Sequence, residues 1–179
     1  DPSNLYRSLE HYRTSFKSHT EAMWVSKLGL RQSAPGDDEL VAQLVSLLRV
    51  VETDMTIFFR SLGTIDGLNP LDMAHAYYDE AALPVDELGL WLGKWWSRVD
   101  GDPDREAMNN ANPKYVLRNW MSQLAIEAAE ADDYSVAIEL LDLLRAPYEE
   151  QPSSQDRWYK KRPEWARHKV GCSMLSCSS

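Results

Sequence analysis

Only two cysteines occur in this chain of 179 residues, and both lie in its last stretch, GCSMLSCSS, residues 171–179. Thiolates act as nucleophiles, metal ligands and redox groups. Four residues separate Cys172 from Cys177, and a flexible segment of that length can close into a labile disulfide. Two cysteines make no disulfide framework, so a reducing compartment is the default. The residues alone leave open a redox pair, half of a metal site, or two exposed thiols without a role.

A metal site at the cysteines lacks ligands. A zinc site needs about four converging side chains, and the two cysteines with the nearest histidine, His168, supply three at most. His11 and His19 stand about two helical turns apart, too far to chelate one ion directly. We therefore expect the four histidines, which include His75, to be structural or surface residues. No metal and no cofactor is expected on this chain.

Other chemistry is also missing from the body of the chain. There is no G-x-S-x-G and no glycine-rich phosphate loop. The stretch DGDPD, residues 100–104, resembles the start of a calcium loop, but Arg105 and Ala111 stand where such a loop needs a glycine and a closing glutamate. We interpret it as a capped polar loop. The body therefore contains no catalytic constellation.

Two further groups have a structural and a functional interpretation. The aromatic residues Trp91, Trp95 and Trp96 could line a ligand groove, but aromatics at helical spacing favour core packing. Arg118 and Asn119 stand inside an apolar stretch. They face solvent, or they form a buried polar pair that pins neighbouring loops, a role suited to the forked guanidinium.

Composition restricts the class of protein. A net charge of −9 disfavours nucleic-acid binding, and no apolar run approaches the ~20 residues that span a bilayer. The first residues show no signal peptide, and we interpret the chain as a fragment or processed product. Residues 157–170 carry six basic side chains and one acidic. This basic stretch either docks on the acidic body or contacts an acidic partner or nucleotide.

Apolar spacing near 3.6 residues dominates the chain, and no useful period-2 segment occurs. We predict an all-α fold: an irregular multi-helix domain over residues 1–170 and a flexible, partly disordered tail over 171–179. Caps and stripes predict helices at 3–28, 37–51, 54–62, 71–78, 84–98, 113–128 and 133–144, with a short one at 163–165. Residues 63–70, 100–112 and 146–154 are predicted loops. Residues 113–145 resemble one helical hairpin.

Several stretches in order resemble the C-terminal region of the selenoprotein O family. They are KLGL (27–30), NPKYVLRNWMSQLAIEAAEADDYS (112–135), LLRAPYEEQP (143–152), RPEWA (162–166) and the terminal SCSS. The most specific are the Asn-Pro-x-x-Val-Leu-Arg-Asn pattern and the Cys-Ser-Ser terminus. The resemblance covers essentially the whole chain.

The resemblance implies a kinase-like protein adenylyltransferase, which uses ATP and Mg²⁺ or Mn²⁺ to transfer AMP to protein hydroxyls. Its nucleotide, metal and catalytic residues belong to a kinase-like core that precedes this region. None of the core's motifs occurs here, so no catalytic, cofactor-binding or metal residue is assigned. The implied partners are that core and the enzyme's protein substrates, with no nucleic acid or membrane. The chain alone is expected to be inactive.

The resemblance also bears on the cysteines and on localisation. Selenium-containing members carry a Cys-x-x-selenocysteine pair with the selenocysteine third from the end, where this chain has Cys177. The expected partner position holds Met174, so Cys172 gives a wider spacing, and a Cys172–Cys177 disulfide remains a hypothesis. Eukaryotic members are expected in mitochondria and bacterial ones in the cytoplasm. The alternative function is a stand-alone helical protein-interaction module, and a small metal-binding protein is a weaker third.

Overall fold

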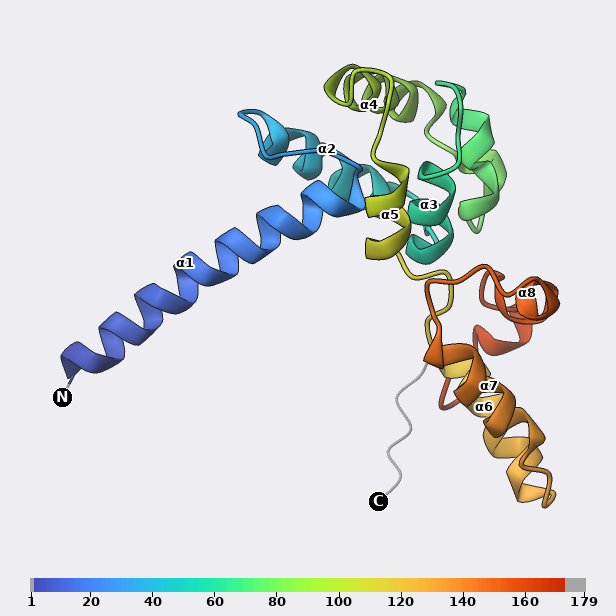
Figure 1. Ribbon diagram of the computed structural model, residues 1–179. Coiled ribbons are helices and arrows are strands. Elements are labelled where there is room, and N and C mark those ends of the chain that lie inside the picture. Colours follow the sequence, from blue (N-terminus) through green and yellow to red (C-terminus); the bar gives the residue numbers. More distant parts are fainter. Residues whose placement is uncertain (1, 173–179) are drawn as a thin grey trace. The chain divides into compact units, whose positions relative to one another are not determined.

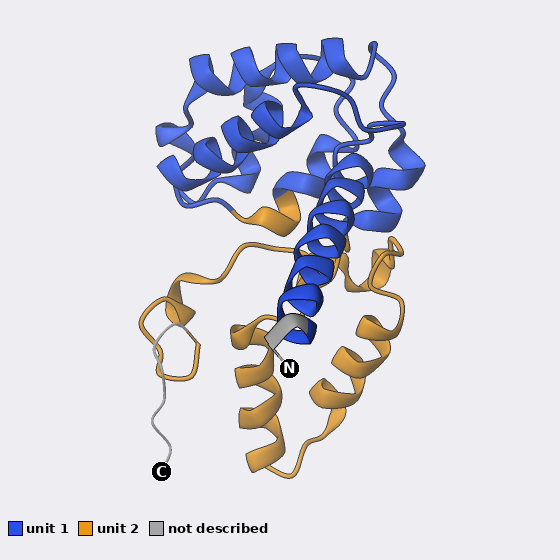
Figure 2. Cartoon of the chain, turned by 90° about the vertical axis from the view of Figure 1, so that its left-hand side faces the viewer, with its two compact units in different colours: residues 1–53, 58–112 blue, residues 54–57, 113–179 orange. Residues whose placement is uncertain are grey.

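The computed structural model describes residues 2–172, which fold into two compact units (Figure 2). Unit 1 comprises residues 1–53 and 58–112, and unit 2 comprises residues 54–57 and 113–179. Residue 1 and residues 173–179 lie outside the described residues, and with them most of the predicted tail. The sequence predicts one domain over residues 1–170, and its pattern gives no signal for a second unit that takes residues from two separate places.

Unit 1 is helical throughout (Figure 1). Its elements are α1 (Pro2–Lys27), α2 (Asp37–Val50), the greater part of α3 (Met55–Leu62), the 3-10 helices η1 (Pro70–Ala76) and η2 (Glu80–Ala82), α4 (Val85–Arg98) and α5 (Arg105–Ala111). Residues 2–172 contain no β-strand, and Thr53 and Tyr77 form an isolated antiparallel bridge. The all-α prediction is confirmed.

Unit 2 consists of α6 (Asn119–Glu130), α7 (Ser135–Arg145), α8 (Pro152–Trp158) and the 3-10 helix η3 (Glu164–Ala166). Helices α6 and α7 lie side by side (Figure 1). Four residues join them, as the predicted hairpin requires. The first turn of α3 also belongs to this unit, because Asp54–Ile57 is grouped with it.

One predicted helix start was wrong, and two helices were missed in segments predicted to be loops. The helix predicted to begin at Pro113 begins at Asn119, because the N–H groups of Lys114 and Tyr115 both donate to the carbonyl of Pro147 and hold that segment out of a helix. Helix α5 lies in a predicted loop, where the Asp104 carboxylate caps it by accepting from the N–H of Ala107 at 3.0 Å. Helix α8 overlaps another predicted loop and begins with proline at its first position.

The core of unit 1 is built on tryptophan. Trp91 and Trp95 are buried and stacked, with ring centroids 6.2 Å apart. Each indole N–H donates to a backbone carbonyl, that of Trp91 to Leu40 at 2.9 Å and that of Trp95 to Leu28 at 2.8 Å. These contacts join α4 to α2 and to the end of α1. Trp96 is half-buried at the edge, so the core-packing interpretation of the tryptophans is confirmed.

The C-terminal end of α1 is fixed tightly to the rest of unit 1. Gly29 has φ +65°, and a Cβ there would lie 2.8 Å from the sulfur of Met108, so only glycine fits this turn. The ammonium of Lys27 donates to Asn112 Oδ1 at 2.7 Å and lies 4.2 Å from the ring centroid of Phe59. Burial lowers the pKa of Lys27. Helix α1 is therefore anchored at its C-terminal end, while most of the helix before that end is exposed.

Candidate functional site

Cys172, the first cysteine of the candidate redox pair, lies in the hydrophobic core of unit 2. Cys172 is only 6% exposed. The buried residues of this core all follow Pro113 in the chain and are Tyr115, Trp120, Met121, Leu140, Leu143, Trp158, Ala166 and Cys172. A thiol in such surroundings is shielded from solvent oxidants. Of the alternatives that the sequence left open, two exposed thiols without a role is therefore wrong for Cys172. Cys177 lies outside the described residues, so their disulfide remains a prediction.

The backbone around Cys172 is held at two points. Its N–H donates to the carbonyl of Lys169 at 3.1 Å, and its carbonyl accepts from the side-chain amide of Asn119 at 3.0 Å. Gly171, which lies between Lys169 and Cys172 in the chain, has φ +85°, and a Cβ there would lie 3.1 Å from Gln123 Oε1. Asn119 and Gln123 are both on α6, so this helix docks the end of the described chain.

An ion pair fastens the same segment one turn further along α6. The Lys169 ammonium contacts the carboxylate of Glu127. Hydrogen bonds from Lys169 and then from Gln123 hold the pKa of Glu127 below its usual value. Both charged side chains are more than a third exposed, so the pair orients the segment more than it stabilises it. The segment Lys169–Cys172 is referred to below as the docked segment.

Arg118 and Asp54 form a largely buried ion pair within unit 2. The guanidinium contacts both carboxylate oxygens, Nη2 reaching Oδ1 at 2.9 Å, and Nη1 also donates to the carbonyl of Lys160 at 3.0 Å. Exposed fractions are 17% for the Arg118 side chain and 4% for that of Asp54. Asp54 also caps α3 by accepting from Ile57 N–H at 3.1 Å. Arg118 and Asn119 both pin neighbouring segments, but they do not form a buried pair: Arg118 is half-buried, whereas Asn119 is exposed and donates to the Cys172 carbonyl. The cap at Asp54 was predicted, but its partnership with Arg118 was not.

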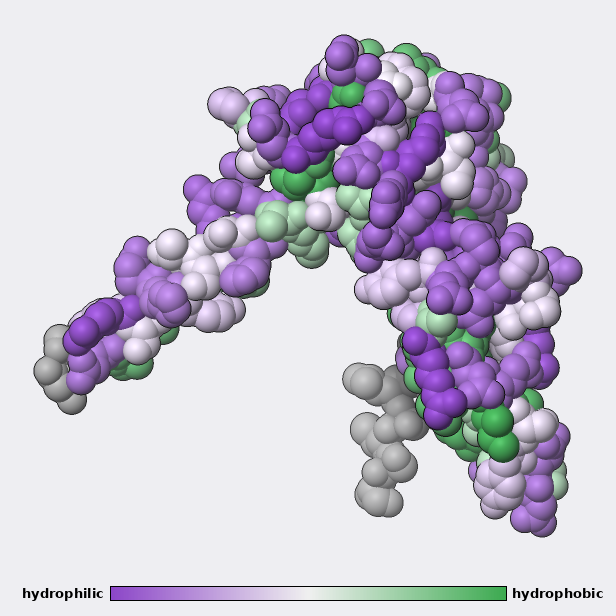
Figure 3. Space-filling model, viewed as in Figure 1, coloured by the Kyte–Doolittle hydropathy of each residue, from purple (hydrophilic) through white to green (hydrophobic). Residues whose placement is uncertain are grey.

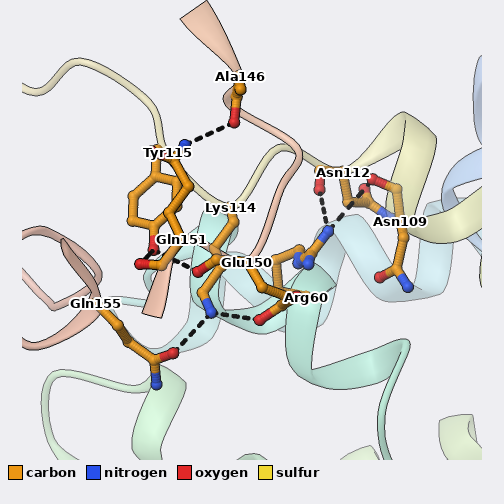
Figure 4. A network of polar contacts seen from close by, with 9 residues as sticks. All are labelled: Arg60, Asn109, Asn112, Lys114, Tyr115, Ala146, Glu150, Gln151 and Gln155. Atoms are coloured by element: carbon orange, nitrogen blue, oxygen red, sulfur yellow. Dashed lines mark hydrogen bonds and ion pairs between the residues drawn. The ribbon is translucent and has the colours of Figure 1, made fainter. Parts of the chain in front are cut away.

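A second buried cation, Lys114, organises the chain ahead of α8 (Figure 4). Its ammonium donates to Glu150 Oε2 at 2.5 Å and to Gln155 Oε1 at 2.9 Å, and it lies 5.0 Å from the ring centroid of Tyr159. The Tyr115 hydroxyl donates to the carbonyl of Glu150 at 2.8 Å. Only 5% of the Lys114 side chain is exposed, so this cation supports the fold and is closed to a ligand.

Figure 4 also shows Arg60 of unit 1, a buried cation on α3. Its Nη1 donates to the carbonyls of Asn109 and Asn112, at 3.3 Å in each case. The guanidinium therefore satisfies carbonyls at the end of α5. Nothing in the sequence pattern distinguished Arg60 from a surface residue, because its partners are far away along the chain.

The basic stretch 157–170 pairs with acidic residues of its own unit. Arg157 contacts Glu139 at 2.5 Å, and Lys169 contacts Glu127. Arg157 also lies over the Trp158 ring, 4.6 Å from its centroid, and Lys160 lies 5.6 Å from that of Trp120. These contacts favour the interpretation that the stretch docks on the acidic body.

The remaining candidate ligands do not converge. Among residues 2–172, no group of three or more His, Cys, Asp or Glu side chains is placed to hold a metal ion. The His75 ring lies 2.7 Å from the Ser61 hydroxyl, while His11 and His168 are exposed. In DGDPD, Asp102 pairs with Arg31 at 2.5 Å and Asp104 caps α5. Among the described residues, these candidate ligands therefore form no cluster that could hold the Mg²⁺ that the family resemblance implies for the enzyme's core.

Comparison with known proteins identifies the class. The sequence model of the family described as protein adenylyltransferase SelO matches residues 1–145. That range is most of the chain, so the chain belongs to this family. The recognition made from the motifs is confirmed.

Individual relatives match the chain over nearly all of its length. A protein nucleotidyltransferase YdiU from Flavobacterium johnsoniae is 42% identical over 193 residues, covering 100% of this chain and 37% of the relative. The YdiU protein of Rhodopirellula baltica is 43% identical, covering 98% of this chain and 37% of the relative. The chain thus spans little more than a third of these relatives. They are bacterial proteins, which gives the mitochondrial expectation no support. Among residues 2–172, none of the helices combines the length and the apolar character that a membrane span requires.

Proposed function

We propose that this chain is the C-terminal helical part of an ATP-dependent protein adenylyltransferase, which transfers AMP to Ser, Thr or Tyr hydroxyls of proteins. The observation that carries the proposal is the match to relatives named nucleotidyltransferases, over the whole chain but little more than a third of their length. The C-terminal assignment is supported by the likeness of the SCSS terminus to that of the family. The chain's role in the enzyme is that of a scaffold.

Chemistry in the proposed enzyme belongs to a kinase-like core ahead of residue 1. When bound there, ATP supplies the AMP group and a divalent metal neutralises phosphate charge. The described side chains contain no group fit to hold that metal, so no step of the transfer is assigned to this chain. With bacterial relatives, we expect the enzyme in the cytoplasm, acting on protein substrates.

A radiolabel assay tests the proposal. We expect the longer polypeptide that contains this chain to transfer AMP from α-labelled ATP to itself or to a protein acceptor. Residues 1–179 alone should transfer none above a heat-treated control. Transfer by the chain alone would contradict the scaffold role. A longer polypeptide inactive with both Mg²⁺ and Mn²⁺ would contradict the family activity and favour a helical interaction module.

We also propose that Cys172 and Cys177 form a regulatory disulfide in the enzyme. The two thiols would lose two protons and two electrons to a peroxide, which is reduced to water and an alcohol, or to water alone. Because the thiol of Cys172 is buried, the docked segment must open before the bond forms. Oxidation is thereby coupled to loss of the Asn119 and Lys169 contacts.

Mass spectrometry of the oxidised enzyme tests the disulfide. Mild peroxide should yield an intramolecular Cys172–Cys177 peptide without dimers, and Cys177→Ser should abolish it. Thiols that remain free, or only intermolecular links, would exclude the redox role while leaving the adenylyltransferase proposal intact.

A further inference from the structure

The first four to five turns of α1 expose large apolar side chains. Exposed fractions are 62% for Leu5, 72% for Tyr6, 46% for Leu9, 64% for Tyr12 and 59% for Phe16. In Figure 3, hydrophobic residues follow one edge of α1. Monomeric proteins rarely expose a contiguous apolar patch larger than a few hundred Å² unless it binds something. We therefore expect this surface of α1 to bind a partner.

The exposed residues form a regular seam. Leu5, Leu9, Tyr12, Phe16 and Met23 follow the alternating four- and three-residue spacing of a heptad, with His19 filling the remaining position. Tyr12 and Phe16 already stack on each other, with centroids 5.9 Å apart. Such a seam fits along another helix at a small crossing angle. We name the side chains at 5, 9, 12 and 16 the α1 seam.

Exposure changes sharply along the helix. The residues from Trp24 to Leu30 are half-buried or buried, and Trp24 lies 6.0 Å from the ring centroid of Phe59. The exposed seam occupies the opposite end, at the start of the chain. We therefore expect its partner in the polypeptide that precedes this region in the longer enzyme, since a tethered partner has a high effective concentration.

We propose that the α1 seam docks on a helix of the polypeptide that precedes residue 1 in the complete enzyme. This rests on the proposed function, in which the catalytic core precedes this chain. The matched relatives have enough additional polypeptide to supply such a helix, because this chain accounts for only 37% of the length of each of the two relatives described above. The α1 seam then fixes the helical part to the enzyme's core.

A second copy of this chain is a poorer occupant. The heptad pattern from Leu5 to Met23, which contains the α1 seam, covers fewer than three heptads, whereas self-pairing coiled coils sustain at least about three to four. Its flanks carry Ser8, Ser15 and Ala22 on one side, and no row of opposite charges that would align two copies. The small flanking residues instead permit close approach of a larger surface.

A photo-crosslinker in the complete enzyme tests the proposal. Tyr12 is replaced by p-benzoylphenylalanine, and Thr14, exposed on the opposite face of the helix, by the same residue as the control. We expect the probe at position 12 to link to peptides preceding residue 1 within one molecule, as judged from a mixture of light and heavy protein. The probe at position 14 should give at most about a tenth of that yield.

Every other pattern overturns the proposal. Links to residues 113–172, links between light and heavy copies, or equal yields from both positions would each show that another surface, or none, covers the seam. AMP transfer is measured on the same preparations. An active enzyme without the expected links contradicts the docking alone, whereas the links in an inactive enzyme contradict the proposed function alone.

Hydrogen exchange provides a second measurement that needs no probe. In the complete enzyme, Leu9→Asp with Phe16→Asp should speed exchange over residues 5–19 by about tenfold or more, because docking protects those amides. The matched control is Thr14→Asp with Ser18→Asp, which adds the same charge on the other face and should change exchange by less than about twofold. Equal effects of the two variants would contradict a docked seam.

Discussion

The buried pair of Arg118 and Asp54 shows what single residues contribute to unit 2. One guanidinium contacts both carboxylate oxygens and also satisfies the Lys160 carbonyl. The sequence alone could not decide whether Arg118 faced solvent, because its partner is distant along the chain. Asp54 was predicted only as a helix cap, a local role that nearby residues reveal.

Arg118→Lys should lower the free energy of unfolding of the chain by about 2 kcal/mol, since an ammonium cannot reproduce the two-point contact with a buried carboxylate. The control is Arg145→Lys, whose pair with Asp142 is exposed and should change stability by less than about 0.5 kcal/mol. Urea unfolding followed by circular dichroism measures both. Equal losses would contradict the importance of burial.

Tyr77 makes unit 1 sensitive to alkali. Burial raises the pKa of its hydroxyl to about 12, against a hydrogen bond with Thr53 that acts in the opposite direction. The unfolded chain loses this proton near pH 10, its ordinary value, while the folded chain keeps it. The contribution is thus fully present below pH 10 and is lost as pH rises towards 12, at up to about 1.4 kcal/mol per pH unit.

Unfolding measured between pH 9 and pH 11.5 checks this dependence. Tyr77→Phe should flatten the alkaline decline relative to the unchanged chain, whatever its stability at neutral pH. Tyr134→Phe, a change at an exposed position, should leave the decline as it is. A Tyr77→Phe chain that declines as steeply as the original would show that other groups carry the dependence.

Among the elements, the docked segment depends on one glycine. Gly171→Ala places a side chain at φ +85° and 3.1 Å from Gln123 Oε1, which should loosen the segment by about 1–2 kcal/mol. In a Cys177→Ser background, the reaction of Cys172 with a thiol reagent should then speed up roughly tenfold. The matched control is Gly36→Ala, at φ +96° with no atom within 4 Å. Acceleration by both variants would contradict local undocking.

How far the sequence predicted the elements depends on where their stabilising contacts lie. Helices with their own stripes and caps, such as α2 and α4, were predicted to within a residue or two at each end. The segment after Pro113 was predicted to be helical from local signals, but hydrogen bonds to Pro147 override them. The burial of Cys172 escaped prediction for the same reason, since Asn119 and the core of unit 2 determine it.

At the scale of the whole molecule, unit 2 is not a continuous stretch of chain. It includes residues 54–57, and so a fragment of residues 113–179 lacks the carboxylate partner of Arg118. We expect that fragment to be less stable than unit 2 in the whole chain. In the fragment, Arg118→Lys should cost less than about 0.5 kcal/mol, against about 2 kcal/mol in the whole chain. Thermal unfolding is measured for the whole chain and for the fragment, each with and without Arg118→Lys. An equal loss of stability in the chain and in the fragment would contradict the role of Asp54 as the partner of Arg118.

The stacked tryptophans have a further consequence. Trp91 and Trp95 lie within 4° of parallel in unit 1, and Trp120 and Trp158 stack with centroids 5.8 Å apart in unit 2. Closely stacked indoles couple their electronic transitions, which produces paired bands in ultraviolet circular dichroism. Each unit therefore contains a native pair of coupled chromophores. Trp91→Phe would remove the paired band of unit 1, and Trp158→Phe would remove that of unit 2. The order in which the two halves melt could then be followed optically without attaching any label.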